Sequence, residues 1–129
     1  ISKSSVNSAQ TNIKDNNIDN INIVRMSSEE FSQAMNGERK FRRLEGFDLT
    51  DYSYDTVLVD PPRAGLDKDS VALVSRFNQV IYISCNPDTL KDNLVELTKS
   101  HDISKFAIFD QFPYTHHVES GVILTKKQK

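Results

Sequence analysis

The single cysteine of this chain is the first candidate for a residue that takes part in a chemical reaction. Cys85 follows the apolar run at residues 80–83 and directly precedes Asn86-Pro87, a pair typical of a helix start. Free backbone N–H groups and the helix dipole at such a start favour a nucleophilic thiolate over a thiol. A single cysteine is more often a small buried apolar side chain, but its position where a strand meets a helix favours a reactive Cys85.

A carboxylate occupies the equivalent place after the preceding apolar run. Asp60 follows residues 56–59, and Pro61-Pro62 fix the backbone direction beyond it. An aspartate that merely accepts hydrogen bonds from its own turn is an equally good interpretation. Ligands of open parallel sheets bind beyond the carboxyl ends of the strands. We therefore expect Asp60 and Cys85 at the same edge of a sheet.

Three arginines are candidates for contacts with RNA. Arg63 ends the proline turn, and its planar guanidinium suits a phosphate, although local evidence slightly favours an ordinary surface arginine. Arg39 and Arg42 flank Phe41 in a basic segment, a combination that suits nucleic acid. Charged runs in loops are usually only solvated, so the solvated interpretation is favoured at this stage.

Glu119 lies at the end of a segment rich in aromatic and imidazole side chains, residues 112–119. A glutamate on a strand is usually solvated, but near a thiolate it can accept a proton. His116 and His117 point in opposite directions on an extended backbone and suit a single metal ion poorly. We therefore expect no metal site.

Alternating strand and helix patterns predict an α/β sheet with helices on both faces. A first helix is expected from a cap at Ser4 or Ser5 to Asp15, and a second after a Ser27–Glu30 capping box. Further helices are expected at residues 67–77 and from Pro87, the last with Leu90, Leu94 and Leu97 inward. Strands are expected at residues 20–26, 56–59, 80–83, 105–112 and 118–126. The short connection between the last two predicts an antiparallel pair at the edge of an otherwise parallel sheet.

Composition narrows the class of protein. Hydrophobic residues make up 37% of the chain and charged residues 26%, as is typical of soluble globular proteins. No apolar stretch is long enough to span a bilayer, which favours a cytoplasmic protein without a membrane partner. The net charge of −2 is not that of a general nucleic-acid binder. One cysteine excludes an internal disulfide and a cysteine-cluster zinc site.

Three ordered motifs resemble the RNA (uracil-5-)-methyltransferase family. They are residues 59–65 (VDPPRAG), 84–87 (SCNP) and 109–119 (FDQFPYTHHVE). Residues 26–37 also resemble the bacterial tRNA-directed subgroup rather than the enzymes that act on ribosomal RNA. The similarity extends over essentially the whole chain.

The resemblance implies a role for each candidate residue. Cys85 corresponds to the nucleophile, Glu119 to the proton acceptor, and Asp60 to a contact of S-adenosylmethionine. The implied reaction is C5 methylation of a uridine in the tRNA T-loop, which gives ribothymidine through a covalent Cys–C6 adduct. The implied fold is a Rossmann-like S-adenosylmethionine-dependent methyltransferase domain, of which residues 1–129 are the C-terminal part.

The family's first two strands and glycine-rich loop are expected upstream of this sequence, whose four glycines are isolated. Without them, a strand at residues 20–26 has no neighbour, and the fragment alone is expected to be inactive. A ribosomal-RNA uracil methyltransferase and a non-catalytic RNA-binding module remain as alternatives. A methyltransferase acting on exocyclic amines is disfavoured, because Arg63 stands where those enzymes carry an aromatic residue.

Overall fold

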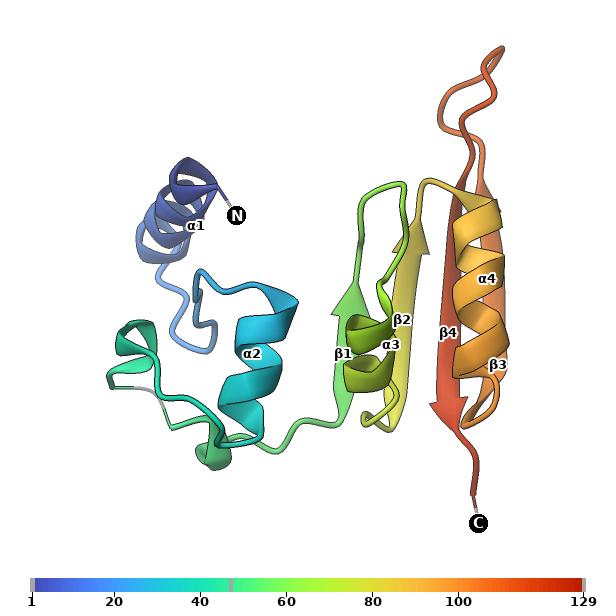
Figure 1. The fold of residues 1–129 in the computed structure, drawn as a ribbon. Coiled ribbons are helices and arrows are strands. Elements are labelled where there is room, and N and C mark those ends of the chain that lie inside the picture. The colour runs from blue at the N-terminus through green and yellow to red at the C-terminus, as the bar shows by residue number, and fades with distance from the viewer. Residues whose placement is uncertain (1, 47, 129) are drawn as a thin grey trace. The chain divides into compact units, whose positions relative to one another are not determined.

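The computed structural model describes residues 2–46 and 48–128, and the chain divides between Tyr52 and Ser53 into two compact units. The first unit contains α1 (Lys3–Asp15), α2 (Ser28–Met35) and the short 3-10 helices η1 (Arg42–Leu44) and η2 (Leu49–Asp51). The second contains the sheet, with β1 (Thr56–Val59), α3 (Lys68–Val74), β2 (Gln79–Ser84), α4 (Pro87–Leu97), β3 (His101–Phe109) and β4 (Glu119–Lys126) (Figure 1).

Local capping signals set the starts of the helices in the first unit. The α1 helix begins after Ser2, whose hydroxyl accepts from the Ser5 N–H at 3.3 Å, rather than after Ser4 or Ser5 as predicted. The predicted capping box of α2 is confirmed: Ser27 and Glu30 each accept a hydrogen bond from the other's backbone N–H at 3.1 Å.

The strand predicted at residues 20–26 is wrong. The segment carries no strand, and the described sheet begins at Thr56. Alternating apolar residues make a strand only where a neighbouring strand accepts and donates the ladder hydrogen bonds. No such neighbour is present among the described residues of this unit.

The second unit is a four-stranded mixed sheet in the order β1-β2-β4-β3. Strands β1 and β2 are parallel, whereas β4 runs antiparallel to both β2 and β3. The antiparallel C-terminal pair is therefore confirmed, with β3 at the edge and β4 inserted beside β2. The β3 strand begins earlier than predicted, at His101, whose buried ring contacts the Phe77 carbonyl oxygen and the Ser100 hydroxyl at 2.9 Å each.

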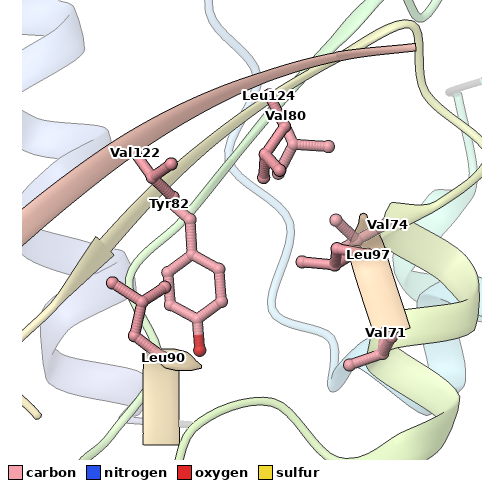
Figure 2. Packing of buried hydrophobic residues seen from close by; sticks show 8 residues of the cluster. All are labelled: Val71, Val74, Val80, Tyr82, Leu90, Leu97, Val122 and Leu124. Atoms are coloured by element: carbon pink, nitrogen blue, oxygen red, sulfur yellow. The ribbon is translucent and has the colours of Figure 1, made fainter. Parts of the chain in front are cut away.

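The core lies between the sheet and helices α3 and α4 (Figure 2). Alternate residues of β2 and β4 face these helices, so both helices cover the same face of the sheet. Helices on both faces were predicted, and within this unit that prediction is wrong. The buried side chains are Val71, Val74, Val80, Tyr82, Leu90, Leu97, Val122 and Leu124, with Leu94 packed against them.

The last strand begins at Glu119 instead of residue 118, and helix α3 also differs from its predicted bounds. Helix α3 ends at Val74 instead of Phe77, and its C-cap Ser75 donates its hydroxyl to the Val71 carbonyl at 2.8 Å. Phe77 is nevertheless buried, in the turn that leads into β2.

Candidate active site

Cys85 lies where the sequence predicted, between the end of β2 and the start of α4. Asn86 caps the helix by accepting from the Asp88 N–H at 3.2 Å, and Pro87 occupies the first turn. The Ser84 hydroxyl accepts from the Asn86 N–H at 3.1 Å and tightens the junction. The thiol is free and only partly buried, so Cys85 is not a core side chain, while its reactivity remains a prediction.

Asp60 lies at the same edge of the sheet as Cys85. Because β1 and β2 are parallel with Val59 opposite Tyr82, residues that follow both strands meet at one edge. Asp60 is exposed there. The predicted proximity of the carboxylate and the thiol along this edge agrees with the parallel pairing, while the role of Asp60 remains a prediction.

Glu119 reaches the edge by a different route. In the antiparallel β2–β4 ladder the last partners are Ser84 and Ser120, joined also by a 3.3 Å hydrogen bond from the Ser120 hydroxyl to the Ser84 carbonyl. Cys85 and Glu119 are each one residue beyond that pair. Glu119 is half-buried, and strand alternation directs it to the face of the sheet opposite α3 and α4.

The turn after Asp60 is fastened to α4 through Arg63. The Arg63 carbonyl accepts from the Asn86 side-chain amide at 2.9 Å and from the Thr89 hydroxyl at 3.1 Å. Its guanidinium belongs to an exposed residue and remains a candidate for contact with RNA. Further along α4, Asn93 accepts from the Leu66 N–H of the same turn at 2.8 Å. Thr89 and Asn93 were not identified from the sequence as contacts of this turn; the available signal was the spacing of polar residues 86, 89 and 93, which lie on one side of a helix.

The predicted basic residues Arg39 and Arg42 belong to the first unit. The Arg39 guanidinium lies 4.8 Å from the centre of the buried Phe41 ring, and Arg42 is exposed in η1. Nearby Arg43 is engaged with the Glu30 carboxylate and donates to the Arg25 carbonyl at 2.6 Å. Part of the cluster thus stabilises its own unit, and contact of Arg39 and Arg42 with RNA remains a prediction.

The imidazoles next to Glu119 are exposed in the β3–β4 loop. The His117 ring makes an edge contact with Phe112, with centroids 6.2 Å apart. Among the residues that the structure describes, no three His, Cys, Asp or Glu side chains are grouped to hold a metal ion. In the same part of the chain, no helix combines the length and apolar character needed to cross a membrane.

Comparisons with known proteins identify the family of this chain. Residues 1–127 match the family model described as tRNA (Uracil-5-)-methyltransferase. The tRNA/tmRNA (uracil-C(5))-methyltransferases of Colwellia psychrerythraea and Pseudoalteromonas translucida are 78% and 64% identical over 127 residues. Each alignment covers 98% of this chain and 35% of the relative, so the chain spans about a third of the length of these relatives.

A solved structure is also similar. The Pyrococcus abyssi tRNA (uracil-54, C5)-methyltransferase, in complex with S-adenosyl-L-homocysteine, superposes with a TM-score of 0.71 at 28% identity. The match covers 96% of this chain and 27% of that one. The family match over residues 1–127, nearly the whole chain, shows that the chain belongs to the tRNA (uracil-5-)-methyltransferase family.

Proposed function

We propose that residues 1–129 form the C-terminal part of the catalytic domain of a longer enzyme that methylates C5 of a uridine in the tRNA T-loop. S-adenosylmethionine is the proposed methyl donor, and the cytoplasm, where bacterial tRNA is modified, is the proposed place of action. The observation that carries the proposal is the β2–β4 pairing, which brings Cys85 and Glu119 one residue beyond the same ladder pair. The names of the relatives, and the uracil-54 in the name of the Pyrococcus abyssi enzyme, support tRNA as the substrate.

The residues present fit one side of a donor site. Asp60 offers an exposed carboxylate beyond the carboxyl end of β1, the edge where open α/β sheets bind nucleotide-like ligands. When bound, S-adenosylmethionine supplies an electrophilic methyl group on a sulfonium. Asp60 would hold and orient the donor beside the base.

The proposed role of Cys85 follows from the weak reactivity of uracil at C5. The thiolate adds to C6, and the electrons of the C5–C6 double bond move through C4 onto its oxygen as an enolate. C5 is then nucleophilic enough to take the methyl group, and the electrons of the broken S–CH3 bond would stay on the sulfur, which leaves as a neutral thioether. One difficult substitution becomes a series of easier steps.

Glu119 completes the proposed cycle. Its carboxylate takes the proton from the methylated C5 and leaves the electron pair to re-form the enolate. Collapse of that enolate breaks the C6–sulfur bond, restores the C5–C6 double bond and releases the Cys85 thiolate. The target uridine has to leave its stacked position in the loop to reach Cys85 and Glu119.

Methylation assays with tRNA and with ribosomal RNA test the proposed substrate. We expect the full-length enzyme and radiolabelled S-adenosylmethionine to label a tRNA transcript at the T-loop uridine, and to leave a transcript with cytidine at that position unlabelled. Labelling of ribosomal RNA in place of tRNA would contradict the proposed substrate. Labelling of neither RNA would contradict the proposed activity and favour a binding module.

A further inference from the structure

The α4 helix holds the turn after β1 through a row of polar side chains. Asn86 and Thr89 contact the Arg63 carbonyl, and Asn93, further along the same side of the helix, contacts Leu66. The turn is therefore attached to α4 at two points, on either side of Gly65.

Asn93 makes the most complete of these attachments. Its side-chain oxygen accepts from the Leu66 N–H at 2.8 Å, and its side-chain N–H donates to the Leu66 carbonyl at 3.0 Å. The Tyr82 hydroxyl donates to the same Asn93 oxygen at 2.7 Å. With both its oxygen and its nitrogen engaged, the Asn93 amide is held in one orientation.

Tyr82 supports Asn93 from inside the core. The ring is fully buried in the cluster between β2 and the helices, beside Leu90 (Figure 2). Burial raises the pKa of Tyr82, so its hydroxyl remains a neutral donor at physiological pH. Neither the ring nor the hydroxyl is exposed to a substrate, and any effect of Tyr82 on the reaction must pass through Asn93.

Gly65 shows independently how closely the turn approaches α4. Its φ is +76°, and a Cβ at this position would lie 2.8 Å from the Asn93 side-chain oxygen and 3.1 Å from the Thr89 Cβ. Only glycine permits this backbone conformation together with this contact. The close approach of the turn to Asn93 therefore depends on the glycine at position 65.

We propose that Asn93, held by Tyr82, is a positioning residue that sets the Asp60–Arg63 turn relative to Cys85. The helix that carries Asn93 begins immediately after Cys85, so a turn fastened to α4 keeps a constant place beside the thiol. This inference rests on the proposed function, in which Asp60 holds the donor and Cys85 holds the base. Misplacing the turn then separates the methyl group from C5 without removing any group that reacts.

Three variants of the full-length enzyme test this role. Leucine in Asn93→Leu is similar in size to asparagine but keeps none of the three hydrogen bonds. A misplacement of reacting groups by about 1 Å can lower a reaction rate on the order of 100-fold. We therefore expect the rate of single-turnover methyl transfer to fall by about 10- to 100-fold. Asn93→Asp keeps an acceptor for Leu66 and Tyr82 and should lose less. The matched control is Asn78→Ala, because the Asn78 amide also joins two loops, donating to Asp55 at 2.7 Å, but at the opposite ends of β1 and β2.

The control separates positioning from simple loss of stability. We expect Asn78→Ala, which removes an exposed hydrogen bond, to lower the unfolding temperature less than Asn93→Leu does, and its methyl-transfer rate to stay within twofold of the parent enzyme at saturating tRNA. The rates are therefore compared well below the unfolding temperatures of all variants. Amide exchange at Leu66 should accelerate only in the Asn93 variants. If Asn93→Leu does not fold, Asn93→Asp and Tyr82→Phe carry the test, and each should transfer methyl more slowly than Asn78→Ala.

Two outcomes separate the inference from the proposed function. Equal methyl-transfer rates for the Asn93 variants and Asn78→Ala, with an active parent enzyme, would overturn the positioning role alone. An inactive parent enzyme would overturn the proposed function, on which the positioning role depends.

Discussion

At the scale of single residues, the proposed site depends on Cys85 and Glu119, which strand pairing places at the same edge of the sheet. Cys85 is marked by its local sequence, because an apolar strand ends before it and a capped helix begins after it. Glu119 carries no comparable mark, since a glutamate at the start of a strand is common. Glu119 becomes a candidate because Ser120 pairs with Ser84, and this register places Glu119 and Cys85 each one residue beyond the pair.

Replacement of Glu119 by glutamine tests its proposed role as proton acceptor. Glutamine keeps the size of the side chain but is not a base, so methylation of C5 should proceed while proton removal stalls. We expect multiple turnover to fall by at least about 100-fold, in the range for loss of a general base, and a methylated covalent complex with unmodified tRNA to accumulate on denaturing gels. Turnover equal to that of the parent enzyme would show that another group takes the proton.

At the scale of elements, capping and turn signals were readable in the sequence. The capping box of α2 and the Asn86-Pro87 start of α4 lie within a few residues, so they could be predicted without knowing the fold. The order of the strands could not, because the insertion of β4 between β2 and β3 is decided by packing between residues far apart in sequence. For the same reason residues 20–26, which have a strand pattern, form no strand.

The cap of α3 gives a pH-dependent prediction. The Asp67 carboxylate accepts from the Ser70 N–H at 2.7 Å, and this bond holds the pKa of Asp67 below its ordinary value. Because the folded pKa is lowered, the stabilisation is full above the ordinary aspartate pKa of about 3.9 and is lost as the pH falls through the lower folded value. Asp67→Ala removes this cap and should lower the free energy of unfolding by about 1 kcal/mol at neutral pH.

Asp67→Asn is the matched variant, because asparagine caps a helix about as well and carries no titrating group. Urea unfolding at neutral pH and near pH 3 should show the parent protein losing stability relative to Asp67→Asn as the pH falls. If the difference in unfolding free energy between the parent protein and Asp67→Asn does not change with pH, the carboxylate is not the form of Asp67 that stabilises the cap.

Gly65→Ala tests the close approach of the turn to α4. A positive φ costs a non-glycine residue roughly 1–2 kcal/mol, and at Gly65 the added Cβ also meets the Asn93 oxygen at 2.8 Å. Gly37→Ala is the control, since Gly37 has a similar φ of +71° but nothing within 4 Å of the added atom. Urea unfolding should show a larger loss for Gly65→Ala, and equal losses would mean that the turn moves away freely.

At the scale of the whole molecule, the residues of the proposed site belong to the second unit. The described sheet, with Asp60, Cys85 and Glu119 at its edge, lies entirely after Ser53. The chain contains no glycine-rich phosphate-binding loop and spans about a third of the length of its relatives. Under the proposed function, Asp60 would offer one contact to the donor, and we attribute the remaining contacts to the part of the relatives' length that this chain does not span.

Calorimetry compares the isolated chain with the full-length enzyme. We expect residues 1–129 alone to bind S-adenosylmethionine weakly and to methylate no RNA, whereas the full-length enzyme binds the donor. Micromolar binding of the donor by the isolated chain would contradict this division of the site.

The most direct test of the account is trapping with RNA. A tRNA transcript with 5-fluorouridine at the target position cannot lose a proton from C5, so the adduct formed after methyl transfer persists. With S-adenosylmethionine and the full-length enzyme, we expect a complex that survives denaturation, with the RNA attached to the peptide that contains Cys85, and no complex with Cys85→Ala. An equal yield of covalent complex from Cys85→Ala, or attachment of the RNA to another residue, would contradict the assignment of Cys85 as the nucleophile.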